Sequence, residues 1–286
     1  MANIGGRFMG FNTPKEITSL SIANGIKKVN MSFSKQFVLA ILAGAFIAFA
    51  SQGSNMAAFN LFSNPDTYGM GKALAGSIFG TGLMLVILAG GELFTGNTLI
   101  IKAVLDKKVT FARMLKNWGV IYSGNLIGSL IIVFFIIMSG QLNSSHGLLG
   151  GVTIKIASYK VGLSFIQALT LGIMCNWLVT LAIWLSLAAK DITGKILGIF
   201  FPIWLFITSG FEHSIANMYY VPAGILAKTN TLWAEASGLS AEKLAELNVG
   251  NFIMHNLLPV TLGNIIGGAV FVGAAYWFVY IKADKA

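Results

Sequence analysis

The chain has 286 residues, of which 56% are hydrophobic and only 10% are charged, and its net charge is +9. A soluble domain carries about 25% charged residues, so this composition excludes an ordinary cytosolic enzyme, a disordered protein and a nucleic-acid-binding domain. Cys175 is the only cysteine, which excludes a disulfide framework and a metal site built from several cysteines.

The first 36 residues have mixed polarity. Lys27 and Lys28 lie among apolar residues such as Ile22, a pattern typical of an amphipathic helix on a membrane surface. We therefore expect residues 1–36 to form a cytoplasmic N-terminal segment and residues 37–286 to form one transmembrane domain. Membrane anchoring and a part in gating are both open for the first segment.

The rest of the chain is dominated by long apolar runs. A transmembrane helix needs about 20 mostly apolar residues. Six runs reach this length, at residues 37–62, 69–105, 114–141, 161–189, 195–227 and 256–282. The second and fifth runs are too long for one straight span and too short for two. The sequence therefore predicts an all-α integral membrane protein with six transmembrane helices, of which spans two and five are broken.

Each of the two long runs is interrupted by a polar patch that contains glycine. A glutamate precedes an asparagine by five residues in both patches: Glu92 and Asn97 at 90–97, Glu212 and Asn217 at 209–217. Backbone at membrane depth must face protein or water, and a helix that restarts there presents a partial positive charge. Thr95 and Ser214 are the predicted N-caps. Two such ends would favour a small anion, and no metal-ligand spacing or cofactor loop is present.

The basic residues are distributed unevenly between the loops. If the N-terminus is cytoplasmic, 14 of the 19 Lys and Arg residues fall on the cytoplasmic side. This bias predicts that both termini are cytoplasmic. It also explains the high net charge without any nucleic acid partner.

The two halves of the chain resemble each other. Three features occur in the same order in both halves. Ala40 and Gly44 of the first half align with Ala168 and Gly172 of the second, the two Glu-Asn pairs align with each other, and Gly124-Asn125 aligns with Gly263-Asn264. Because each half, 37–141 and 161–282, has three spans, the second half is inserted upside down. An inverted 3+3 repeat with paired broken helices indicates a transport site between the repeats. The segment at about 229–254 is predicted to be exposed and amphipathic.

Several side chains near the breaks are candidates for the site. His213 either hydrogen-bonds or protonates an anion, or locks the loop. Glu212 is predicted to be a structural acid paired with Lys160. Asn176 either bonds across helices or points into the pore. Five apolar side chains either form constrictions or only pack, namely Phe79, Leu83, Leu93, Phe94 and Phe206.

Five motifs carry a resemblance to one family. They are Gly-Glu-Leu-Phe-Thr at 91–95, Lys-Asn-Trp at 116–118, Gly-Asn at 124–125, Gly-Phe-Glu-His-Ser-Ile-Ala-Asn-Met at 210–218 and Pro-Val-Thr-Leu-Gly-Asn-Ile-Ile-Gly-Gly at 259–268. With them, about residues 37–282 resemble the formate/nitrite transporter family. The resemblance implies an aquaporin-like protomer with its own pore, assembled as a homopentamer in the lipid bilayer of a cytoplasmic (inner) membrane.

The resemblance also implies roles for single residues. Residues Glu92–Thr95 match the family's mobile loop, and His213 matches its central histidine, with Thr95 as the hydrogen-bonding threonine. Asn176 and Lys160 match an asparagine and a lysine of span four. The resemblance places Leu83 and Phe94 at an inner constriction and Phe79 and Phe206 at an outer one. One departure is Glu92, where the formate channel has an aspartate. That departure leaves the choice of anion open.

These observations predict a channel for small monovalent anions, formate first. Nitrite or hydrosulfide is the alternative within the same architecture. An intramembrane enzyme that uses His213 and Glu212 is the rival of another class, but the spans contain no set of nucleophile, base and orienting residue. A purely structural scaffold is the third alternative, and paired breaks without a cavity argue against it.

Overall fold

The computed structural model describes residues 10–283 of the chain, so the ends of the predicted terminal segments, 1–9 and 284–286, lie outside the described residues. The described part is built from helices: α1 (Pro14–Asn30), α2 (Phe33–Phe62), α3 (Tyr68–Met84), α4 (Phe94–Asn97), α5 (Ile101–Leu105), α6 (Phe111–Met138), α7 (Leu148–Val161), α8 (Phe165–Ala188), α9 (Ile192–Thr208), α10 (Ser214–Ala227), α11 (Thr231–Ser237), α12 (Ala241–Glu246), α13 (Val249–Asn251), α14 (Leu258–Ile265) and α15 (Ala275–Trp277). Turns with π-helical bonding continue α3 to Gly90 and join α13, α14 and α15 into one long helix that ends at Lys282.

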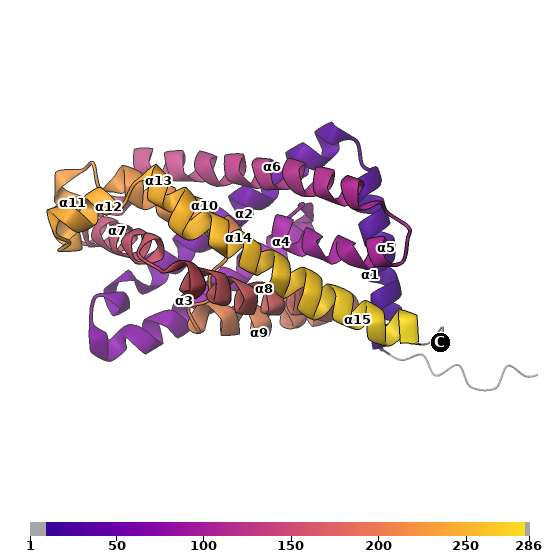
Figure 1. Ribbon diagram of the computed structural model, residues 1–286. Helices are drawn as coiled ribbons and strands as arrows, with labels where there is room; N and C mark the ends of the chain where they lie inside the picture. The colour runs from indigo at the N-terminus through magenta and orange to yellow at the C-terminus, as the bar shows by residue number, and fades with distance from the viewer. Residues whose placement is uncertain (1–9, 284–286) are drawn as a thin grey trace, which may run out of the picture.

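The long helices form a bundle with two distinct ends (Figure 1). Helix α1 crosses one end, where the last turn of the C-terminal helix also lies. Helices α7, α11 and α12 lie at the opposite end. We call these the α1 side and the α7 side of the molecule.

The predicted spans are present in the bundle. Five helices in the described part are long and apolar enough to cross a membrane: Phe33–Phe62, Pro65–Gly90, Phe111–Met138, Phe165–Ala188 and Val249–Lys282. The shorter apolar helix α9 continues across a break into α10. The prediction of an all-helical protein with two broken spans is confirmed.

Both breaks begin at a glycine in the left-handed region. Gly90 has φ +97° and Gly210 has φ +72°, a conformation that residues with a Cβ rarely adopt. The helix therefore ends sharply at each glycine and restarts four residues later, at Phe94 and at Ser214.

Spans three and six pack closely against their neighbours through glycine. A Cβ atom at Gly128 would overlap the carbonyl oxygen of Ile41, and a Cβ atom at Gly267 would overlap that of Ile173. Small residues at such positions let two helices approach within a membrane. These contacts bring α6 against α2 and the C-terminal helix against α8.

The same contacts correct the expected alignment of the two repeats. Asn125 donates to the carbonyl oxygen of Ala40, and Asn264 donates to that of Gly172. Ala40 is therefore equivalent to Gly172 rather than to Ala168. The alignment inferred from the sequence is wrong by one helical turn, because small residues recur at that spacing in both helices.

The segment at about 229–254 is largely exposed and amphipathic, as expected, with Trp233 and Leu247 on its buried side. One further expectation is wrong on the α7 side. Lys160 does not begin span four. It lies in the last turn of the separate helix α7, and span four begins at Phe165 behind a Ser164 capping box.

Helix α1 begins with a capping box of its own. The Thr13 hydroxyl accepts the backbone N–H of Glu16, and the Glu16 carboxylate accepts the backbone N–H and the hydroxyl of Thr13. These bonds hold the pKa of the Glu16 carboxyl below its ordinary value. The cap fixes the start of a helix whose far end reaches the first break.

Candidate functional site

The first break holds a polar cluster, which we call the α1-side cluster: Lys28, Glu92, Asn97 and Asn117. The Lys28 ammonium lies 2.8 Å from both carboxylate oxygens of Glu92 and donates to Asn97 Oδ1 at 2.8 Å. Asn97 Nδ2 donates to Glu92 at 2.8 Å and to Asn117 at 2.9 Å. The predicted spacing of glutamate and asparagine thus brings the two side chains of the break together, with a lysine from α1.

The second break holds the equivalent α7-side cluster: Lys160, Glu212, Asn217 and Asn256. Lys160 Nζ lies 2.7 Å from Glu212 Oε1, as the sequence predicted. Asn217 Nδ2 donates to Glu212 and to Asn256, both at 2.7 Å. Because Glu212 balances Lys160 at close range, this lysine is a structural partner rather than a free cation.

Two asparagines hold the ends of the breaks. Asn125 Oδ1 accepts the backbone N–H of Phe94, and Asn264 Oδ1 accepts that of Ser214, both at 2.9 Å. Their Nδ2 groups donate to the carbonyl oxygens of Glu92 and Glu212 at 2.9 and 3.0 Å. Each asparagine therefore caps a half-helix from a neighbouring span. The prediction that Thr95 and Ser214 are the N-caps is wrong.

The two breaks meet at Thr95 and His213. The Thr95 hydroxyl lies 2.9 Å from His213 Nε2, and both residues are buried. His213 is itself the N-cap of α10, since its Nδ1 accepts the backbone N–H of Ala216 at 3.1 Å. In this geometry Nδ1 is an acceptor, so the ring proton of a neutral His213 lies on Nε2 and faces Thr95.

Asn176 bonds across helices, which was one of its two predicted alternatives. Its Nδ2 lies 3.2 Å from the Thr95 carbonyl oxygen and 2.6 Å from that of Asn264. Its Oδ1 has no hydrogen-bond partner in the described part of the chain, and neither has the buried hydroxyl of Ser214. Unpaired polar atoms therefore remain where the two half-helices meet.

The apolar candidates separate into two groups. Phe79 and Phe206 meet edge to face with ring centroids 5.5 Å apart, and both are buried. On the other side of the breaks, Leu83 and Leu93 line one cavity.

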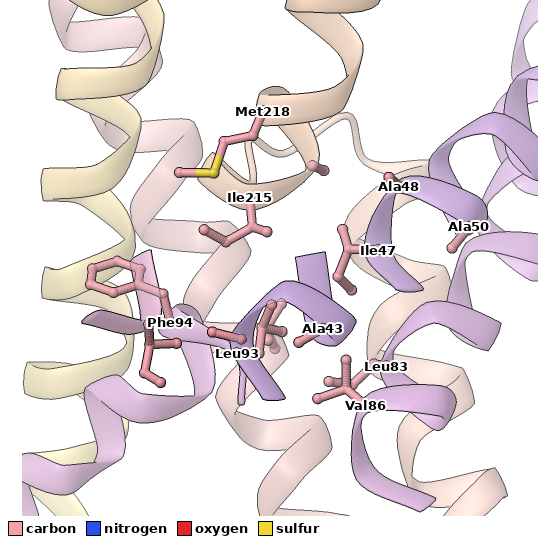
Figure 2. Close-up of a cluster of buried hydrophobic side chains, with 14 of the residues drawn as sticks. Ala43, Ile47, Ala48, Ala50, Leu83, Val86, Leu93, Phe94, Ile215 and Met218 are labelled. Carbon is pink, nitrogen blue, oxygen red and sulfur yellow. The ribbon is translucent and has the colours of Figure 1, made fainter. Parts of the chain in front are cut away.

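Phe94 differs from the expectation that it belongs with Leu83. It packs against Trp118 and Tyr122 of α6, with ring centroids 5.9 and 4.9 Å away. Figure 2 shows Phe94 on the far side of Leu93 from Leu83. In the structure, Leu93 and not Phe94 lines the cavity together with Leu83. Phe94 instead anchors the restarted half-helix against α6.

A cavity leads to the breaks from each side of the molecule. The α1-side cavity has a volume of about 340 Å³, and the α7-side cavity has a volume of about 640 Å³. Three lysines and one glutamate line each of them: Lys27, Lys28, Lys35 and Glu92 on the α1 side, Lys72, Lys155, Lys160 and Glu212 on the α7 side. Both approaches are therefore positively charged. In the described residues, no group of three His, Cys, Asp or Glu side chains could hold a metal ion.

Some of these residues were missed at the level of the sequence. The sequence placed Lys28 only on a surface helix. In the structure it pairs with Glu92 of the first break, as Lys160 pairs with Glu212 of the second. The Gly-Asn motifs were valued for their glycines and not for Asn125 and Asn264. The signal was available, because the same dipeptide follows the break in both halves.

Comparisons with known proteins agree with this geometry. The family model described as Formate/nitrite transporter matches residues 15–278. The chain is 37% identical to "Formate channel FocA" of Escherichia coli over 274 residues, which is 95% of each chain. It is also 37% identical to "Formate channel BtFdhC" of Bacillus thuringiensis, covering 96% of this chain and 98% of the relative.

Solved structures give the same result. A structure titled "Pentameric formate channel with formate bound" matches with a TM-score of 0.78 and 40% identity, covering 87% of this chain and 98% of the other. One titled "FNT family ion channel" matches with a TM-score of 0.76 and 28% identity, covering 92% and 98%.

Proposed function

This chain belongs to the formate/nitrite transporter family, a family of multi-pass membrane proteins, and we propose that it is a channel that passes formate. Formate, a small monovalent anion, crosses through a pore in each protomer. The observation that carries this proposal is the contact of Thr95 with His213, where two broken spans meet between two basic cavities. Nitrite or hydrosulfide is the alternative substrate at the level of the family.

The breaks supply the binding energy for an anion. The N-terminal end of each restarted half-helix lies at the meeting point of the breaks and carries a partial positive charge. The Thr95 hydroxyl and the unpaired hydroxyl of Ser214 add hydrogen-bond donors there. We assign the substrate pathway to Thr95, His213 and Asn176, with Lys160 and Glu212 as supports for the break.

His213 acts in this proposal as a neutral hydrogen-bonding group. Its Nε2–H donates to the Thr95 hydroxyl, which then directs its own hydrogen toward the anion. To deliver a proton, the ring would first need a second proton on Nδ1. That proton would displace the backbone N–H of Ala216, which Nδ1 now accepts.

Apolar rings on both sides of the breaks keep hydrated ions out. Phe79 and Phe206 form the constriction on the α7 side, and Leu83 with Leu93 forms the one on the α1 side. Moving a bare charge through an apolar ring is costly, so an anion that is hydrogen-bonded between the rings passes more easily than a strongly hydrated ion.

The family and the distribution of charges support a proposal for assembly and location. We propose a homopentamer in a bacterial inner membrane, with both termini and the α1 side cytoplasmic. The location of the C-terminal end beside α1 and the excess of basic residues in the predicted cytoplasmic segments support this orientation. The proposal includes no chemical reaction and no cofactor.

The contacts of α1 and α7 also support a longer repeat than 37–141 and 161–282. Lys28 of α1 and Lys160 of α7 hold equivalent glutamates at the two breaks. We propose that the repeats begin with these helices, at 14–138 and 148–282, so that α1 belongs to the channel domain.

Flux into proteoliposomes tests the function. Purified protein is reconstituted, and uptake of formate, nitrite and hydrosulfide is compared under one pH gradient. Fast formate uptake supports the proposal. Faster uptake of another anion keeps the pore and changes the substrate, and no uptake of any of the three contradicts the proposal.

The variant His213→Asn separates the two roles of His213. Asparagine keeps an acceptor for the Ala216 N–H but does not titrate. If His213 only hydrogen-bonds, flux falls while its dependence on pH keeps the wild-type shape. A pH dependence that disappears in this variant would instead support proton transfer.

A further inference from the structure

The α7-side cavity contains cations that the polar cluster does not use. Of its three lysines, Lys160 is neutralised by Glu212 at 2.7 Å. Lys72 and Lys155 have no carboxylate within 4 Å among residues 10–283. Lys155 is exposed on α7, whereas Lys72 is half-buried on α3. Lys72 is therefore the cation nearest the interior whose charge is left for a ligand.

Lys72 lies at the outer face of the aromatic constriction. It precedes Phe79 by seven residues on α3, which is two helical turns on the same face. A Cβ atom at Gly210 would lie only 3.6 Å from Lys72 Nζ, and Gly210 follows Phe206 by four residues, about one turn of helix. The ammonium group of Lys72 thus lies close to both helix α3, which carries Phe79, and the end of helix α9, which carries Phe206.

A buried amide faces the same cavity without a partner. Asn55 of α2 is 2% exposed, and its Nδ2 donates to no acceptor in the described part of the chain. Its neighbour Ser54 donates to the carbonyl oxygen of Ala75, which holds this turn of α2 against α3 one turn from Lys72. A buried donor without an acceptor is costly, and an acceptor from the cavity would remove that cost.

We propose that Lys72 Nζ and Asn55 Nδ2 form an entrance subsite that binds a small monovalent oxyanion in front of the Phe79–Phe206 constriction. The inference rests on the proposed channel function and names a step before permeation. The anion exchanges part of its hydration shell for a charge-assisted bond from Lys72 and a bond from Asn55. It then enters the apolar ring with less water to lose.

Concentration dependence of flux tests the subsite. Formate uptake is measured in proteoliposomes over a range of formate concentrations, for wild type, Lys72→Met and Asn55→Leu. Lys72→Met keeps an unbranched side chain of nearly the same length and removes its charge, so we expect the half-saturating concentration to rise about tenfold. Asn55→Leu removes the donor, and we expect a rise of about fivefold. The maximal flux stays within about twofold, because both residues lie outside the constriction.

Two controls separate a specific subsite from the general field of the cavity. Lys155→Met removes an exposed lysine of the same cavity and is expected to change the half-saturating concentration less than about twofold. Lys72→Arg keeps the charge and is expected to retain most of the wild-type affinity. Elution of each variant at the wild-type volume verifies its assembly.

The outcomes distinguish this inference from the channel function itself. If Lys72→Met behaves like Lys155→Met while the wild type passes formate, the entrance subsite is wrong and the channel function stands. If the wild type passes no formate, the proposed function fails and the inference fails with it.

Discussion

The two polar clusters use the same chemistry but are held in different ways. In both, a lysine neutralises the glutamate of a break, and an asparagine five residues later bonds to that glutamate. The lysine of the α7-side cluster comes from a helix packed between α10 and α11, and its side chain is 11% exposed. The lysine of the α1-side cluster comes from the first helix of the described chain, and its side chain is 27% exposed.

The comparison extends to the residue that precedes each restarted half-helix. His213 caps α10 with its own ring, whereas the equivalent Leu93 gives α4 no side-chain cap. One break is therefore closed by a polar ring and the other is lined by an apolar side chain. Both repeats therefore build the same broken helix. Because one copy has His213 where the other has Leu93, an anion in the proposed pore meets a polar surface at one break and an apolar surface at the other.

The largest expected effect comes from the asparagines that cap the half-helices. Asn264→Leu and Asn125→Leu each leave one backbone N–H and two carbonyl oxygens without their partner. We expect each variant to lose about 5 kcal/mol of stability, because the buried N–H and carbonyl groups of the break are left unpaired, while the second carbonyl oxygen keeps its bond within its own helix. Thermal unfolding in detergent measures this. A loss at only one of the two positions would contradict the equivalence of the two breaks.

The lysines should distinguish the clusters. Lys160→Met leaves Glu212, which is 2% exposed, as a buried charge without its cation, and we expect a loss of about 4 kcal/mol. Lys28→Met should cost only about 1 kcal/mol, since water reaches the more exposed α1-side pair. The double variants Lys160→Met with Glu212→Gln, and Lys28→Met with Glu92→Gln, serve as controls. Equal losses for the two single variants would contradict the difference in burial.

Phe94 and Ser214 are the first residues of the two half-helices, and an asparagine binds the backbone N–H of each. Their side chains differ in how they pack. Phe94→Ala removes a ring that packs against Trp118 and Tyr122, and we expect a loss of about 3 kcal/mol. Ser214→Ala removes a buried hydroxyl with no partner, so its effect on stability should stay within about 0.5 kcal/mol. Reduced formate flux in Ser214→Ala at unchanged stability would assign that hydroxyl to the anion. A clear loss of stability would show a partner that this structure lacks.

A small effect is also expected from replacing one cap with another. His213→Asn keeps an acceptor for the Ala216 N–H, so its stability should change by less than about 1 kcal/mol. His213→Ala removes the acceptor and should cost about 1 kcal/mol more than the asparagine variant. The unfolding midpoints of the two variants test whether the ring acts as a cap. Equal midpoints would show that Nδ1 contributes nothing to the start of α10.

Much of this architecture could be predicted from the sequence, because it is local. Span length follows from runs of apolar residues, and the breaks follow from glycine and polar residues inside two of those runs. Even the pair of Lys160 and Glu212 could be inferred, since few charges lie near the spans. The contact of Thr95 with His213 followed from the resemblance to a family and not from spacing.

The errors concern contacts between segments far apart in the chain. Composition does not distinguish a lysine on a surface helix from one that reaches a break, which is why Lys28 was missed. Thr95 and Ser214 were chosen as caps because caps are usually local. The side chains that actually accept the first N–H of each half-helix, Asn125 and Asn264, lie 31 and 50 residues away. The rotation of Phe94 toward α6 likewise depends on packing that spacing cannot reveal.

Capping from a neighbouring span also sets an order for the biogenesis of the protein. The half-helix that starts at Phe94 can be completed once Asn125 has left the ribosome and its span has been inserted. The half-helix that starts at Ser214 has to wait for Asn264, which lies 50 residues further along the chain. A truncated chain that lacks the last span therefore leaves the N–H of Ser214 and the carbonyl oxygen of Glu212 without their partner from span six.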